Sequence, residues 1–95
     1  MEMRTDDLIL CLEGRVVEVF GRQSDYNERI HVEMFAAESK PHGDGGAKVR
    51  LGRMRPGDTE LFVGAGRIPM KLDASQWAEF QRFFEAVKAA RALPA

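Results

Sequence analysis

The stretch that decides the fold is DASQWAEFQRFFEAVKAARAL, residues 73–93, near the end of the chain. When it is wound at the helical period, its large apolar side chains fall on one arc. These side chains are Trp77, Phe80, Phe83, Phe84, Val87 and Ala90. Asp73 at the start and Gln76 three residues later form a capping-box pattern, which satisfies free backbone N–H groups. The sequence therefore predicts an amphipathic C-terminal helix whose apolar arc covers another element.

The apolar arc of this helix divides into an expected core and an expected edge. We predict that Trp77, Phe80, Phe84 and Val87 are structural core residues. Phe83 is expected nearer the edge of the arc, where an exposed ring would help two copies of the chain to associate.

Composition limits the domain count and the class of protein. The chain of 95 residues is long enough for one domain only, and 44% hydrophobic with 31% charged residues is ordinary for a globular domain. A formal net charge of -1 disfavours a dedicated nucleic-acid binder, which usually carries a strong basic excess. The single cysteine, Cys11, excludes an intrachain disulfide, and its apolar run is too short to span a membrane. We expect a cytoplasmic protein with a flexible stretch at residues 1–7 and one domain over residues 8–93.

The first half of the chain contains three β-rich runs. Leu8–Leu12 and Arg15–Phe20 are separated by Glu13-Gly14, and a two-residue connection with glycine is typical of a hairpin. Glu28–Ala37 is predicted to be one long strand because its residues alternate between apolar and mostly polar. Its inward-facing set is Ile30, Val32, Met34 and Ala36.

The second half is predicted to contain a mobile loop and three further strands. Lys40–Gly46 holds three glycines and one proline, which favour a surface loop. Ala47–Gly52 reads as the next strand. Thr59–Gly64 and Arg67–Leu72 are expected to form a second hairpin, in which Pro69 favours an edge position or a bulge because it lacks an N–H group.

Six antiparallel strands followed by one helix resemble the pleckstrin-homology-like superfold. In that superfold two nearly orthogonal sheets, usually of seven strands, are closed at one end by a C-terminal amphipathic helix, and Trp77 stands where its characteristic tryptophan is expected. The resemblance implies a mainly β protein with one C-terminal α-helix, an antiparallel β-sandwich or partly open barrel of six to seven strands capped by the helix. The chain is similar to small bacterial proteins of this layout whose function is unknown.

The resemblance does not carry over to the lipid-binding members. Members that bind phosphoinositides have a cluster of lysines and arginines on the first two strands and the loop between them. Here the segment from Leu8 to Phe20 holds one basic residue, Arg15. The residues therefore do not support phosphoinositide binding, since fold alone does not determine function.

Residues able to perform catalysis or bind metal lack the necessary spacing. Ser24, Asp25 and His31 provide the groups of a nucleophilic triad, but the first two lie in an expected turn without an oxyanion hole. His31, His42 and Cys11 lack the close ligand pairs of a zinc site. We therefore expect no catalytic residues, no metal and no cofactor.

One group of charged residues is a candidate binding site. Strand parity places four basic side chains on solvent-facing positions: Lys48, Arg50, Arg67 and Lys71. If their two strands are neighbours, these side chains form a basic stripe that attracts anions; otherwise they belong to an ordinary solvated face.

Two hypotheses for function follow from these observations. The first is a non-enzymatic protein-interaction module that binds a protein partner or forms a homo-oligomer, through the helix or a sheet edge. The alternative is a binder of anionic ligands or phosphate groups that uses the basic strand face.

Overall fold

The computed structural model describes residues 1–22, 27–55 and 68–93, and these ranges contain seven β-strands followed by one α-helix. The elements are β1 (Glu2–Arg4), β2 (Leu8–Glu13), β3 (Val16–Gly21), β4 (Asn27–His31), β5 (Phe35–His42), β6 (Gly46–Arg53), β7 (Ile68–Leu72) and α1 (Ala74–Arg91). The strands form two antiparallel sheets, ordered β1-β2-β3-β4 and β5-β6-β7. The predicted mainly β fold with one C-terminal helix is confirmed.

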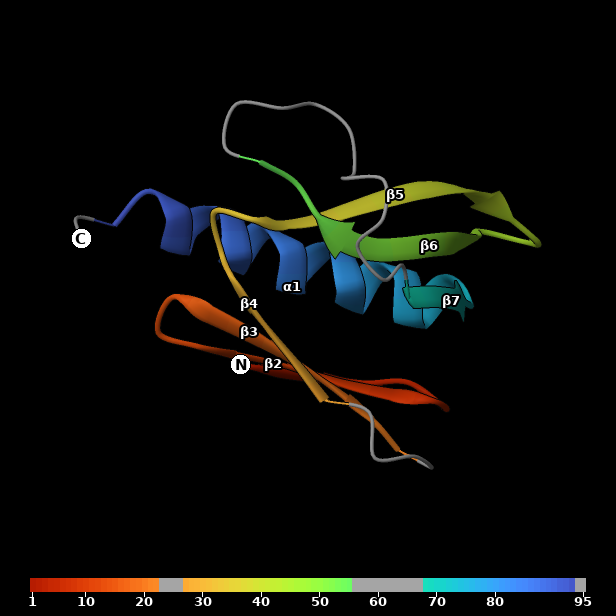
Figure 1. Cartoon of the computed structure of the whole chain (residues 1–95). Helices are drawn as coiled ribbons and strands as arrows, with labels where there is room; N and C mark the ends of the chain where they lie inside the picture. The colour runs from red at the N-terminus through yellow and green to blue at the C-terminus, as the bar shows by residue number, and fades with distance from the viewer. Residues whose placement is uncertain (23–26, 56–67, 94–95) are drawn as a thin grey trace.

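The helix α1 lies between the two sheets (Figure 1) and contacts β1 and β2 of one sheet and β6 and β7 of the other. Its buried side chains are Phe80, Phe83, Val87 and Ala90. They share one core with apolar side chains of both sheets, among them Leu10, Val19, Val49 and Leu51. The described strands do not close into a barrel, in agreement with a sandwich or partly open barrel capped by a helix.

The start of the helix follows the predicted capping box. Asp73 Oδ1 accepts the N–H of Gln76 at 2.8 Å, and Gln76 Oε1 accepts the N–H of Asp73 at 3.0 Å. Each bond satisfies a backbone donor that the first helical turn leaves without a partner. The short segment between β7 and α1 is thereby fixed, and with it the direction in which the helix enters the core.

The helical arc is divided differently from the prediction. Phe83 has an exposed fraction of 0%, so the expectation of an exposed ring at the edge of the arc, available to a second copy of the chain, is wrong. Phe80 and Val87 are buried, whereas Trp77 and Phe84 are only partly buried and pack against the rim of the core. The two partly buried side chains, Trp77 and Phe84, lie together at one margin of the arc, whereas Phe83 and Ala90 at the other margin are buried.

The N-terminus is more ordered than the sequence indicates. Residues 1–7 were expected to be flexible, but Glu2–Arg4 forms β1 and pairs with β2 in the register Met3↔Leu10. The expectation is wrong for these residues because the Met3 side chain, with an exposed fraction of 1%, is part of the core. A single buried side chain in three residues is too short an alternation to be recognised as a strand.

The predicted strand Glu28–Ala37 is in fact two strands in different sheets. It is interrupted by a turn at residues 32–34, in which Met34 N–H donates to His31 O at 2.8 Å. Met34, expected to point inward, is exposed, whereas Phe35 is fully buried at the start of β5. The chain therefore crosses from the first sheet to the second at this turn.

The loop predicted at residues 40–46 is shorter than expected. β5 extends to His42, β6 begins at Gly46, and only Gly43, Asp44 and Gly45 connect them. Gly43 and Gly45 have φ values of 63° and 79°, which glycine adopts without strain. Lys40 is therefore a strand residue.

The remaining hairpin predictions have mixed outcomes. The β2–β3 turn is shifted by one residue, to Gly14-Arg15, with Glu13 opposite Val16. The strand predicted at Thr59–Gly64 lies outside the described residues. Pro69 is on β7, which is an edge of its sheet among the described strands, as expected for a residue without an N–H group.

Candidate anion-binding cleft

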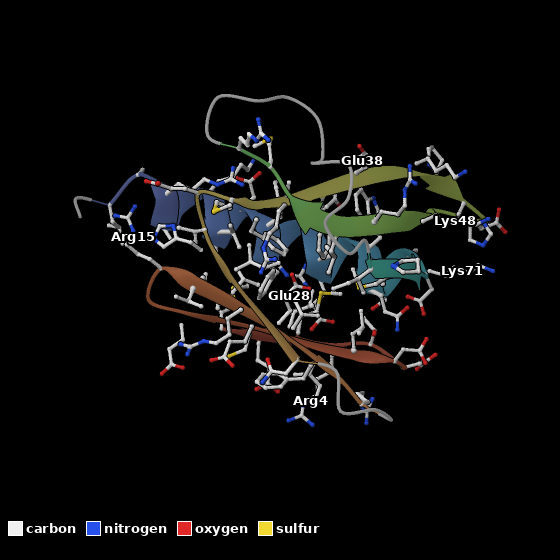
Figure 2. All side chains as sticks on the ribbon, in the orientation of Figure 1. Arg4, Arg15, Glu28, Glu38, Lys48 and Lys71 are labelled. Atoms are coloured by element: carbon white, nitrogen blue, oxygen red, sulfur yellow. The ribbon has the colours of Figure 1, made fainter. Side chains whose placement is uncertain are left out.

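Strand register in the second sheet brings three lysines into one line. Lys40 of β5 lies directly opposite Lys48 of β6, and Lys48 lies directly opposite Lys71 of β7. Neighbouring strands are about 4.8 Å apart, so three consecutive positive charges cross the sheet at right angles to the strands. We call Lys40, Lys48 and Lys71 the lysine row. Figure 2 shows two of its members, Lys48 and Lys71, at the same end of the sheet.

The lysine row is not neutralised by neighbouring acids in the described part of the chain. None of its three ammonium groups has a carboxylate of a described residue within 4.0 Å. The adjacent position along β6 is different, because Arg50 is paired with Glu38 at 3.1 Å. Like charges directly opposite each other on a sheet are destabilising. The row is therefore a concentration of positive charge that costs the folded state free energy.

A cleft of about 820 Å³ lies against the lysine row. All three lysines line it, together with the paired residues Arg50 and Glu38. The remaining acidic lining comes from the turn between β1 and β2, which contributes Asp6 and Asp7. The cleft thus has a basic wall on the second sheet and an acidic wall on a turn of the first sheet.

The turn that carries the acidic wall is held firmly by hydrogen bonds. Thr5 N–H donates to Leu8 O at 2.8 Å, and Leu8 N–H donates to the Thr5 hydroxyl oxygen at 3.0 Å. Arg22, the residue directly after β3, binds the turn: its guanidinium donates to Thr5 O at 2.8 Å and its backbone N–H donates to Asp7 O at 2.9 Å. Thr5 itself is buried, with an exposed fraction of 7%. The exposed side chains of Asp6 and Asp7 therefore project from a fixed backbone.

A smaller hollow of about 390 Å³ adjoins the cleft and shares Asp6 and Lys71 with it. It lies over the β5–β6 turn and the start of α1, where His42, Asp44 and Asp73 also line it. The two hollows together extend the polar surface from the lysine row to the N-terminus of the helix.

Three of the four residues predicted for the basic stripe are brought together by the fold. Lys48, Arg50 and Lys71 line one cleft on neighbouring strands, while Arg67 lies outside the described residues. Sequence reasoning missed Lys40, because it was assigned to a loop, and the acidic wall, because residues 1–7 were expected to be flexible. The sequence marks β1 only by Met3 between two charged residues, followed by the turn-forming pair Asp6-Asp7, and this pattern is too short to predict a strand.

The residues considered for catalysis or metal binding are not assembled into a site in the described ranges. His31 is exposed, and its Nδ1 accepts the N–H of Glu33 at 3.2 Å. His42 is on β5 and Cys11 is on β2, in different sheets. Ser24 and Asp25 lie outside the described residues. Within residues 1–22, 27–55 and 68–93, no group of three His, Cys, Asp or Glu side chains is placed to hold a metal ion.

Comparison of the chain with protein-family models, curated proteins and solved structures gave no match. The resemblance to the pleckstrin-homology-like superfold therefore stays a prediction.

Among the described residues, no helix has both the length and the apolar character needed to cross a membrane.

Proposed function

We propose that this protein is a non-enzymatic binding module that holds an anionic group on the lysine row. The observation that carries the proposal is the direct register of Lys40, Lys48 and Lys71 along the wall of a cleft, without an acidic partner among the described residues. An anion placed there relieves the repulsion between the three ammonium groups and gains charge-assisted hydrogen bonds. Lys48 is half-buried, which reduces the screening of its charge by water.

The proposal accounts for the neighbouring charges as well. Arg50 lies beside the row, two residues along β6 from Lys48, and is already paired with Glu38, so we do not assign it a role in binding. Where basic side chains elsewhere serve the fold, they are bonded: Arg53 to Glu28 at 2.8 Å and Arg15 to Glu33 at 3.0 Å. The lysine row differs from these pairs because its charge remains available to a ligand.

The test is a titration of the full chain with tripolyphosphate, a linear polyanion, at low ionic strength by isothermal calorimetry. Lys48→Gln removes the central charge and is expected to weaken binding about ten- to hundredfold, since a charge-assisted hydrogen bond contributes about 1.5–3 kcal/mol. The matched control is Lys88→Gln, which makes the same charge change on α1, where Lys88 is paired with Glu85 at 2.7 Å. Equal affinity of Lys48→Gln and Lys88→Gln would contradict the proposal.

The same variant has a second expected effect of opposite sign. Because Lys48 lies directly between two other lysines, Lys48→Gln should raise the free energy of unfolding by about 0.2–1 kcal/mol in the absence of ligand. Weaker binding together with higher stability identifies a residue retained for a ligand rather than for the fold. A loss of stability in Lys48→Gln would indicate that the lysine serves packing instead.

A second candidate function is binding to a protein, including a second copy of the chain. The supporting observation is that two of the exposed large apolar side chains, Met34 and Leu93, lie in segments bound by one arginine. Arg15 donates to Leu93 O at 2.7 Å and to the carboxylate of Glu33, the neighbour of Met34. Light scattering over a range of protein concentrations tests this candidate. A monomeric mass at every concentration, in the wild type and in Met34→Ser, would exclude self-association.

A further inference from the structure

We infer that the cleft takes a small dipolar ligand, with its anionic group on the lysine row and a protonated amine against Asp6 and Asp7. The inference rests on the proposed function and adds the chemical class of the ligand. Its starting point is that one cleft of about 820 Å³ has walls of opposite charge. This volume lies within the range of sites that bind small molecules.

The acidic wall argues against a ligand that carries only negative charge. Asp6 and Asp7 are exposed, and neither has an ion-pair partner within 4.0 Å among the described residues. A polyanion that fills the cleft from wall to wall brings negative charge toward both carboxylates, and part of the attraction of the lysine row is lost. A ligand with an amine at the other end gains from both walls.

The rigidity of the acidic wall strengthens this argument. A mobile loop would carry its carboxylates away from an approaching anion. The turn at residues 5–8 cannot do so freely, because three hydrogen bonds join Thr5 to Leu8, and Arg22, directly after β3, also binds the turn. The two walls are thus preorganised, which lowers the entropy cost of binding a ligand that matches them.

Nucleic acid and other long polyanions fit the cleft less well than a zwitterion does. A groove that follows a phosphate backbone is positive along its length, whereas here the positive charge is confined to one wall. Phosphate esters of small amino alcohols have the required chemistry, with a dianionic group and an ammonium group separated by a short chain.

The experiment compares two probes that differ by one group: O-phosphoethanolamine, which has the amine, and ethyl phosphate, which lacks it. Each is titrated into the ¹⁵N-labelled full chain and followed by two-dimensional NMR at low ionic strength. The wild type is expected to bind phosphoethanolamine about tenfold more tightly than ethyl phosphate, with shifts at amides of β5, β6, β7 and the 5–8 turn.

The decisive variant is Asp6→Asn/Asp7→Asn, which keeps the size and turn preference of both side chains. It should weaken phosphoethanolamine binding and strengthen ethyl phosphate binding, so that the tenfold preference disappears. The matched control is Glu13→Gln, which removes an exposed carboxylate at the opposite end of β2 and should retain the preference. The dispersion of the NMR spectrum reports directly whether each variant is folded.

The outcomes separate the inference from the proposed function. If the wild type binds both probes equally, or if Asp6→Asn/Asp7→Asn keeps the preference, the dipolar ligand is refuted while anion binding at the lysine row stands. If Lys48→Gln leaves the binding of both probes and of tripolyphosphate unchanged, the proposed function fails and the inference fails with it.

Discussion

The burial of Phe83 leads to a quantitative prediction for Phe83→Ala. The ring has an exposed fraction of 0% and lies among buried side chains of both sheets and the helix. Removing a fully buried phenyl ring costs about 3–5 kcal/mol, from lost transfer free energy and the cavity that remains. A domain of this size has about 5–15 kcal/mol of stability in total, so the variant loses a large share of it. At about 4–8 °C per kcal/mol, the melting temperature should fall by roughly 12–40 °C.

The measurement is urea and thermal unfolding followed by circular dichroism. Gln81→Ala is the matched control, since Gln81 is exposed on the same helix and should change stability by less than about 0.5 kcal/mol. Trp77→Ala should fall between the two because Trp77 is only partly buried. The midpoint for Phe83→Ala should not depend on protein concentration, since its contacts are within one chain. A loss below about 1 kcal/mol, or a midpoint that depends on concentration, would refute the placement of Phe83.

Three further substitutions test local features of the fold by the same unfolding measurements. Gly46→Ala places a Cβ 2.2 Å from Leu72 O, so β6 and β7 must separate; we expect a loss of about 1–3 kcal/mol, and an unchanged midpoint would contradict the close approach. Asp73→Ala removes the side chain that caps Gln76 N–H and should lower the free energy of unfolding by about 0.5–2 kcal/mol. An unchanged midpoint would show that the cap does not form in solution. Arg91→Met loses two hydrogen bonds to backbone carbonyls and should cost about 1–3 kcal/mol, whereas Arg82→Met on the exposed face of the helix should cost less than about 0.5 kcal/mol. Equal effects of the two arginine substitutions would show that Arg91 does not hold the sheet crossover.

The C-terminal helix could be predicted from sequence because its signals are local. The cap at Asp73 and the periodic apolar arc lie within one continuous segment, and they need no partner to be recognised. The assignment of Phe83 failed for a different reason. Its burial depends on the direction from which two sheets approach the helix, and the arc alone contains no information on that direction.

The crossover between the sheets could not be predicted because its turn has no local sequence signal. Residues 32–34 contain no glycine, proline, asparagine or aspartate, so the alternation of Glu28–Ala37 continues through them without a break. The turn is held by contacts from distant segments instead. Val32 N–H donates to Arg15 O at 2.9 Å, and Arg91 Nε donates to Val32 O at 2.7 Å. Tertiary hydrogen bonds here override a strand pattern of period two.

Only part of the lysine row could be predicted from sequence: the outward direction of Lys48 and Lys71, but not the register that places the lysines opposite each other. Parity placed Lys48 outside because Val49 and Leu51 of β6 are apolar and must face the core. It placed Lys71 outside because Met70 and Leu72 of β7 are apolar in the same way. Parity does not say which residues stand opposite each other. That depends on the three-residue connection from Gly43 to Gly45, which sets Lys40 against Lys48.

The hydrophobic core imposes the strand register that produces the lysine row. A slip of one residue along β6 would relieve the repulsion between Lys48 and its neighbours. It would also turn Val49 and Leu51, both with exposed fractions of 0%, toward water. Burial of two such side chains contributes about 3–6 kcal/mol, which exceeds the repulsion of a like-charged pair on a sheet. The core therefore fixes the register, and within that register only substitution of a lysine removes the repulsion. The proposed anionic ligand would explain lysine on all three strands, and the opposite responses of binding and stability to Lys48→Gln test that explanation directly.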